Sequence, residues 1–154
     1  MGKLVYFSFF ALILIGSLFY FSGKQPALNL PEGTEKVTLF KSASCGCCGA
    51  YSSWLGRKGF DVGIVNTDMA SVHRKYGVPE DMTSCHMAIY GNYFVEGHIP
   101  IEAIKKLLVE KPDIKGIAMP GMPSGSPGMP GAKDGQFIIY AVAKDGSTYE
   151  FMRV

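Results

Sequence analysis

Short apolar runs separated by helical patterns predict a mixed α/β domain over residues 36–154. We expect strands at 36–40 and 61–66, each rich in β-branched or large apolar residues. The stretch 45–58 between them predicts a helix that ends at Gly59. If this helix is a crossover connection, the two strands are parallel.

The next part of the pattern predicts a hairpin between two further helices. A short helix is expected at 69–76, behind Asp68 as its capping residue. The runs 87–90 and 93–96 predict antiparallel strands, because the Gly-Asn pair between them favours a tight turn. Apolar residues at helical spacing predict a helix with one apolar face at 101–110.

The pattern changes at Gly116. The stretch 117–131 is rich in Met, Pro and Gly and predicts a long loop, and loops of this length are commonly functional or disordered. The runs 136–142 and 147–154 predict a C-terminal β-hairpin across an Asp-Gly turn. The order β-α-β-α-β-β-α is that of a thioredoxin-like domain, so the predicted class is α/β, with a mixed sheet and flanking helices.

An N-terminal apolar segment precedes this domain. The run from Leu4 to Ser22 carries no charge and spans about 28 Å as a helix, close to the roughly 30 Å of a hydrocarbon core. We expect residues 1–23 to be an uncleaved membrane anchor, with a cleaved signal peptide as the alternative, and residues 24–35 to be a linker. In either case the domain is exported, and an anchor places it on the periplasmic side of the inner membrane.

Charge and composition exclude one class of partner. The formal net charge is +2, and the lysines are scattered instead of forming a basic block, so nucleic-acid binding is not expected. About 120 residues remain after the anchor and linker, enough for a hydrophobic core without disulfide support. The four cysteines are therefore free for chemistry.

Three cysteines lie within four positions, between the first strand and the first helix. Cys45 and Cys48 have the C-x-x-C spacing of thiol-disulfide redox sites, and Cys45 and Cys47 have a C-x-C spacing that lets two thiolates bind one metal. Ser42 and Ser44 are candidate helix caps, and the helix dipole is expected to favour the thiolate form. The cluster predicts thiol chemistry, metal binding, or both.

Cys85 and His86 form a second candidate pair, just before the third strand. In a thioredoxin-like order this loop faces the cysteine turn, so a thiolate and an imidazole there can complete a site begun by the first three cysteines. His98 is either a further ligand or a helix-capping residue, and His73 is expected on a solvated helix face.

The long loop offers three thioethers, Met119, Met122 and Met129. Thioethers and thiolates are soft ligands that suit Cu(I), and imidazole binds copper less selectively. The alternative is that these methionines simply cover an apolar surface. We expect the loop to act as a lid over the site, with the methionines as candidate additional ligands.

Five motifs in order resemble one family: KSASCGCCG at 41–49, GVPE at 77–80, SCH at 84–86, VEGHIP at 95–100 and GIAMPGMPSGSPG at 116–128. The sequence is similar to the periplasmic CopG-type metal-binding proteins over about residues 36–150. That family has a thioredoxin-like fold and is associated with copper and silver resistance. The resemblance implies a copper site whose ligands are Cys45, Cys47, Cys48, Cys85 and His86.

Three functions follow from these observations. The first is an exported protein that holds Cu(I), as a single ion or a multinuclear thiolate cluster, and so limits copper toxicity outside the cytoplasm, with other copper-handling proteins as partners. The second is a thiol-disulfide oxidoreductase that uses Cys45 and Cys48, which leaves Cys47, Cys85 and His86 without a role. The third combines them, with bound copper cycling between Cu(I) and Cu(II). Three free thiols persist in an oxidising compartment only when metallated or in use, which favours a copper site.

Overall fold

A computed structural model describes Gly33 and residues 36–154, and these residues form a mixed α/β structure around one seven-stranded sheet. No helix in this described part is long and apolar enough to cross a membrane. The predicted anchor and linker lie outside the described residues and stay predictions. In chain order the elements are β1 (Lys36–Lys41), α2 (Gly46–Arg57), β2 (Asp61–Asn66), α3 (Met69–Tyr76), the 3₁₀ turn η1 (Glu80–Met82), β3 (His86–Tyr90), β4 (Tyr93–Glu96), α4 (Ile101–Glu110), β5 (Ile114–Ala118), β6 (Ile138–Ala143) and β7 (Thr148–Arg153).

The strands lie in the order β2-β1-β3-β4-β5-β6-β7. β1 is parallel to β2 and β4 is parallel to β5, and the other neighbouring pairs are antiparallel. The predicted crossover between β1 and β2 and both predicted hairpins are therefore confirmed. The Asp68 carboxylate caps α3 as expected, by accepting the N–H groups of Ala70 and Ser71.

Strand β5 was missed by the sequence pattern, which predicted a loop from Gly116 onward. The reason lies at Gly116, which faces Phe94 across the parallel β4–β5 pair. A Cβ at Gly116 would collide with the carbonyl oxygen and ring of Phe94. Only glycine fits this close approach, and glycine weakens the strand signal in the sequence. β5 extends the predicted four-stranded sheet toward the C-terminal hairpin.

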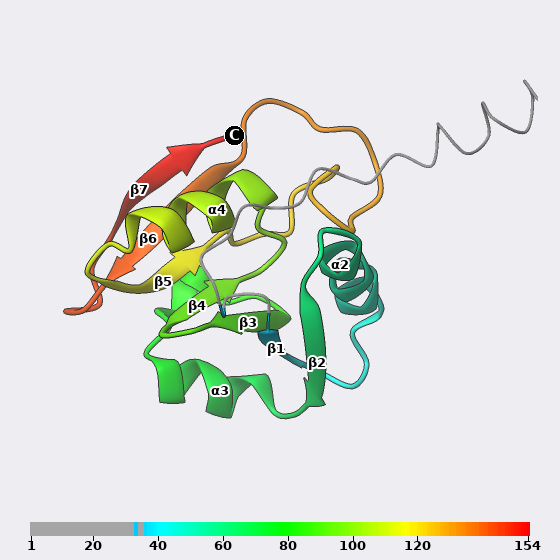
Figure 1. Ribbon diagram of the computed structural model, residues 1–154, viewed down its shortest axis with the longest axis horizontal. Coiled ribbons are helices and arrows are strands. Elements are labelled where there is room, and N and C mark those ends of the chain that lie inside the picture. The colour runs from blue at the N-terminus through cyan, green and yellow to red at the C-terminus, as the bar shows by residue number, and fades with distance from the viewer. Residues whose placement is uncertain (1–32, 34–35) are drawn as a thin grey trace, which may run out of the picture.

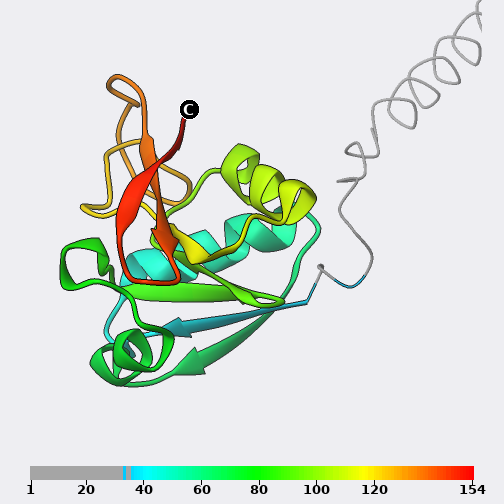
Figure 2. The ribbon, with the colours of Figure 1, turned by 90° about the vertical axis from the view of Figure 1, so that its left-hand side faces the viewer.

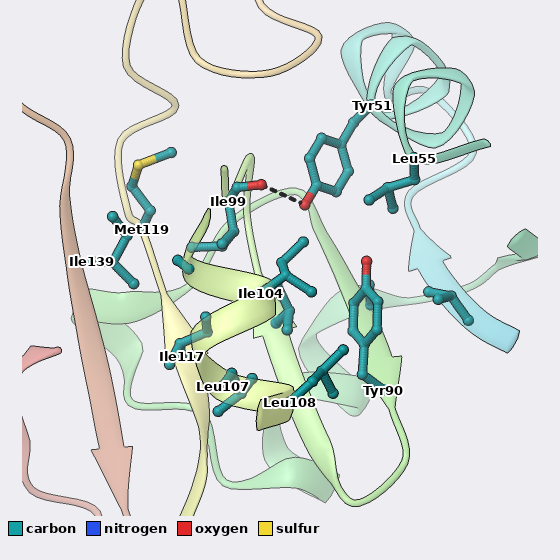
Figure 3. Packing of buried hydrophobic residues seen from close by; sticks show 14 of the residues in the cluster. Tyr51, Leu55, Tyr90, Ile99, Ile104, Leu107, Leu108, Ile117, Met119 and Ile139 are labelled. Carbon is teal, nitrogen blue, oxygen red and sulfur yellow. Dashed lines mark hydrogen bonds between the residues drawn. The ribbon is translucent and has the colours of Figure 1, made fainter. Parts of the chain in front are cut away.

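Helices α2 and α4 cover one face of the sheet and pack the main hydrophobic cluster against it (Figures 1 and 3). Leu55 of α2, Ile104 and Leu107 of α4, and Ile117 of β5 are fully buried there. Tyr51 of α2 joins the two helices to one another, because its hydroxyl donates to the Ile99 carbonyl oxygen at 3.0 Å (Figure 3). This bond fixes the first turns of α2 beside the segment that leads into α4.

Helix α3 lies on the opposite face of the sheet (Figure 2). The cluster beneath it is smaller, with Val72, Met87, Phe94 and Val142 as its buried members. Side chains of β3 therefore alternate between the two faces: His86, Ala88 and Tyr90 lie on the α2 side, and Met87 lies on the α3 side.

The register of β1 and β3 brings two distant segments together. Lys41 at the end of β1 is paired with His86 at the start of β3. Because α2 begins five residues after Lys41, the cysteine turn and the Cys85-His86 pair meet at the same end of the sheet. The loop between β5 and β6 lies beside the start of α2 (Figure 1), and a Cβ on Gly128 of this loop would approach the Tyr51 nitrogen to 2.7 Å.

Candidate metal centre

The first turn of α2 presents the cysteine cluster. Cys45 is the N-cap residue, and its sulfur accepts the N–H of Cys48 at 3.3 Å. The expectation that Ser42 or Ser44 caps this helix is wrong, because the helix begins at Gly46 and the two hydroxyls contact each other at 3.1 Å. A sulfur that occupies the cap position is held close to the N–H groups of the first turn.

Cys85 lies at the centre of a four-sulfur cluster. Its Sγ is 3.3 Å from that of Cys45, 3.9 Å from that of Cys47 and 3.4 Å from that of Cys48. All four sulfurs lie within 4.8 Å of one another. Cys45 and Cys48 are joined by a disulfide, whereas Cys47 and Cys85 are free thiols.

A second cluster shares Cys85 with the first. Its members are Cys85, His86 and His98, whose ligand atoms also lie within 4.8 Å of one another. The Nδ1 atom of His86 is 3.9 Å from the Cys85 sulfur, and the rings of His86 and His98 are 4.7 Å apart. The structure thus brings together all five residues that the sequence resemblance implied as ligands, and adds His98.

His98 is positioned as a ligand more than as a helix cap. The N-cap of α4 is Pro100, and no side chain caps it. Instead, His98 Nδ1 lies 2.7 Å from the Pro127 carbonyl oxygen, so Nδ1 carries the proton that it donates. That tautomer leaves a lone pair on Nε2, which is buried and has no hydrogen-bond partner. Metal-binding histidines are commonly oriented in this way, by a bond from the other ring nitrogen to a carbonyl.

Burial keeps the two histidines neutral and Cys85 protonated in the absence of metal. Burial, reinforced by His98, lowers the pKa of His86 to about 3, and burial also lowers the pKa of His98. Burial, reinforced by neighbouring Cys47, raises the pKa of the Cys85 thiol to about 11. Neutral imidazoles can ligate metal at once, whereas the thiol must release its proton when metal binds.

Tyr51 and Trp54 form one wall of the centre. The Tyr51 ring lies 4.8 Å from the His86 ring and 5.2 Å from the His98 ring, and Trp54 stacks on it at 5.6 Å. Trp54 is the single tryptophan of the chain, so its fluorescence reports on this site.

The three methionines of the loop occupy different environments. The Met122 sulfur is 3.4 Å from the Cys85 sulfur, and Met122 is exposed. Met122 also has a backbone φ of 46°, which is uncommon for a residue other than glycine. Met119, in contrast, is buried in the main hydrophobic cluster. Met129 is half-buried, and its N–H donates to the Ser126 carbonyl in a loop turn.

Sequence reasoning missed a buried acid behind the centre. Glu96 is fully buried, and its Oε1 accepts the Ser84 N–H at 2.5 Å and lies 3.1 Å from His73 Nε2. The expectation that His73 is solvated is therefore wrong, since its side chain is only 12% exposed. Burial raises the pKa of Glu96, and the contacts with His73 and Ser84 oppose that shift. The available signal was a glutamate at the end of an otherwise apolar strand.

Comparisons with known proteins agree with this geometry. A family model described as a protein of unknown function, DUF411, matches residues 82–129. A solved structure named copper resistance protein CopG, form 1, is 36% identical in sequence, with a TM-score of 0.71 over 77% of this chain and 96% of its own. Form 2 matches with the same identity and TM-score, over 77% of this chain and 97% of its own. No curated protein matches significantly. With this identity over nearly the whole of those structures, the chain belongs to the CopG-type copper-resistance family.

Proposed function

We propose that this chain is an exported copper-binding protein that holds Cu(I) in a thiolate and imidazole site and so contributes to copper resistance. The observation that carries the proposal is the position of Cys85, whose sulfur belongs to both the four-sulfur cluster and the Cys85-His86-His98 cluster. A thiolate shared by two adjacent ligand sets can bridge two metal ions. The arrangement therefore favours a multinuclear site over a single ion.

The donor set fits the chemistry of Cu(I). Thiolates and thioethers are soft ligands, and four cysteines with Met122 beside Cys85 supply them. The two neutral histidines add nitrogen ligands without bringing charge into the buried site. The names of the two similar structures, which refer to copper resistance, support copper as the metal. Ag(I) is also a soft cation, so a contribution to silver resistance belongs to the same proposal.

The Cys45–Cys48 disulfide is the group whose reduction makes the site available to copper. Its reduction by an external dithiol, which is itself oxidised to a disulfide, yields two thiols, and the cluster offers four thiolates to Cu(I) once metal binding has released the thiol protons. The proposal includes cycling of bound copper between Cu(I) and Cu(II). It is supported by the mixture of soft sulfur donors and harder nitrogen donors.

The cellular location of the domain and its thioredoxin-like fold are also part of the proposal. We place the domain on the periplasmic side of the inner membrane, held there by the predicted segment 1–23. A thioredoxin-like frame is supported by the order β2-β1-β3-β4 and by the position of the cysteine turn before α2. Partners are copper ions and other copper-handling proteins of that compartment.

The test is the metal content of the protein purified without oxygen after reduction, compared with a Cys47→Ser variant. We expect the wild type to retain more than one Cu(I) per chain and the variant to retain fewer. Cys47 is not part of the C-x-x-C pair, so a site that uses only Cys45 and Cys48 predicts no difference. Equal and negligible copper in both proteins would contradict the proposal.

A thiol-disulfide oxidoreductase is the second candidate, because Cys45 and Cys48 are disulfide-bonded. This function predicts that the metal-free protein reduces the disulfides of insulin, with full activity in the Cys47→Ser variant. It gives no role to the buried pair His86 and His98.

A further inference from the structure

The Ser84-Cys85-His86 segment carries two of the candidate ligands but lies outside the helix that carries the other cysteines. Only His86 of the three belongs to a strand, and Ser84 and Cys85 precede β3. Some other contact must therefore fix the Cys85 sulfur within 3.3–3.9 Å of the sulfurs on the α2 side. One side-chain contact to the backbone of this segment comes from Glu96.

Glu96 reaches this segment from the opposite face of the sheet. It is paired with Met87 in the β3–β4 register, and Met87 lies in the cluster beneath α3. From that side, Glu96 Oε1 accepts the Ser84 N–H, one residue before Cys85, and also contacts His73 of α3. Glu96 therefore joins α3 to the ligand segment without touching the candidate metal ligands with its side chain.

The backbone around Glu96 is too tightly packed to absorb a shift of this segment. The Gly97 N–H donates to the His86 carbonyl at 3.1 Å, and the Met119 N–H donates to the Glu96 carbonyl at 3.1 Å. Gly97 has a φ of 83°, and a Cβ there would lie 2.7 Å from the Met119 carbonyl oxygen and 3.4 Å from the Ser84 hydroxyl. Ser84, Gly97 and the end of β5 thus lie in direct contact.

A buried carboxylate at this place is costly for stability alone. Glu96 Oε2 and the Ser84 hydroxyl are both buried without hydrogen-bond partners. Unpaired polar atoms in a protein interior call for a functional explanation. The explanation that fits the contacts is positional, since the other carboxylate oxygen binds the backbone next to a ligand.

We propose that Glu96 is a positioning residue for the copper site: its carboxylate holds the Ser84 amide and thereby sets Cys85 and His86 opposite the cysteines of α2. This inference rests on the proposed copper function. The His73 contact keeps the carboxylate oriented from the side of α3.

The experiment compares five reduced, oxygen-free proteins: wild type, Glu96→Leu, Glu96→Gln, Glu96→Asp and the control Val95→Ala. Leucine removes the acceptor for the Ser84 N–H. Glutamine keeps an acceptor oxygen at the same reach, and aspartate keeps the charge but withdraws it by one methylene group. Val95 is fully buried in the same strand but belongs to the cluster on the other face, so the control lowers stability without removing the contact.

Two properties are measured. Cu(I) affinity is obtained by competition with a chromophoric Cu(I) chelator, and the nitrogen and sulfur neighbours of bound copper are obtained by X-ray absorption spectroscopy. We expect Glu96→Leu to lose about 10- to 100-fold in affinity, as for residues that orient metal ligands, and to lose nitrogen neighbours while sulfur from α2 remains. Glu96→Gln should stay near the wild type, Glu96→Asp should fall between them, and Val95→Ala should match the wild type.

Two results would overturn the inference. One is wild-type affinity and coordination in Glu96→Leu, and the other is an equal loss in Val95→Ala, which would reduce the effect to stability. If Glu96→Leu does not fold, the comparison of aspartate with glutamine decides, because wild-type coordination in Glu96→Asp also contradicts the proposal. Failure of the copper function is distinguishable, since the wild type itself would then bind no Cu(I).

Discussion

The two ends of the sheet differ in how many buried polar atoms lack a hydrogen-bond partner. At the end that holds the cysteines, four buried side-chain atoms have no hydrogen-bond partner in the described part of the chain: Ser84 Oγ, His86 Nε2, Glu96 Oε2 and His98 Nε2. Tyr90, which ends β3 at the other end of the sheet, carries the one further such atom among the described residues, its hydroxyl, and other polar groups there pair locally. The Tyr93 hydroxyl donates to the Pro112 carbonyl oxygen at 2.9 Å, and Lys144 forms an exposed ion pair with Asp113.

This difference separates a binding end from a structural end. Turns at Gly91 and Gly146 close the structural end, where both glycines have positive φ values that suit tight turns. A hollow there is lined by Tyr93, Lys111 and Lys115 among others. Unpartnered buried atoms are rare in folded proteins, so their concentration beside the thiols indicates groups kept available for a ligand.

The largest effect on copper binding is expected from the substitution Cys85→Ala at the binding end. Cys85 is the sulfur common to both clusters, so its removal takes a ligand from each. We expect Cu(I) affinity to fall by more than about 100-fold, beyond the effect typical of residues that only orient ligands. Competition with a Cu(I) chelator measures this loss, and Cys85→Ser serves as the matched variant of similar volume. An affinity within a few fold of the wild type would remove Cys85 from the site.

Two substitutions at His98 distinguish a ligand role of Nε2 from the hydrogen bond that Nδ1 makes to the loop at Pro127. His98→Asn can keep a donor to the Pro127 carbonyl but offers no nitrogen in place of Nε2, and His98→Leu loses both. If Nε2 ligates copper, both variants lose affinity, by about 10-fold or more. Quenching of Trp54 fluorescence by Cu(I) checks this result. Wild-type binding in His98→Asn would restrict His98 to holding the loop.

Acid should destabilise the reduced, metal-free protein through the binding end. The folded pKa of His86, about 3, lies below the ordinary value of 6.5, so the unfolded chain takes up a proton below pH 6.5 while the folded chain does not. The free energy of unfolding therefore falls as pH drops below 6.5, by up to about 1.4 kcal/mol per pH unit for this group. His98 acts in the same direction. Urea unfolding at several pH values measures the slope, which the variant His86→Asn should flatten.

The smallest effect is expected at the structural end. Lys144→Ala removes the ion pair with Asp113, but both side chains are largely exposed, at 65% and 84%. Exposed pairs contribute little to stability. Chelator competition should give wild-type Cu(I) affinity, and urea unfolding should give nearly unchanged stability. A marked loss of copper binding in this variant would show that the two ends are coupled, and would contradict their separation into a binding end and a structural end.

Most of the elements and the first group of candidate ligands could be predicted from the amino-acid sequence. Short apolar runs and turn residues are local signals, so they predicted β1, β2, both hairpins and α4. The three clustered cysteines are adjacent in the chain, and their proximity needs no folding to be seen. The pairing of the cysteine turn with Cys85 and His86 was also expected, but only through the element order of a known fold.

The remaining features of the site depend on packing between distant segments. The sequence left His98 open between ligand and helix cap, and the bond to Pro127 favours the ligand. His73 proved to be a largely buried partner of Glu96 instead of a solvated residue. Strand β5 can lie against β4 because Gly116 has no Cβ to collide with Phe94. Glycine has a low strand propensity, so this strand gives a weak signal in the sequence. These outcomes depend on contacts between residues far apart in the chain, and burial is the main cause of the pKa shifts of His86 and Glu96. A sequence pattern records which side chains are present, whereas packing determines which of them lose water and face one another.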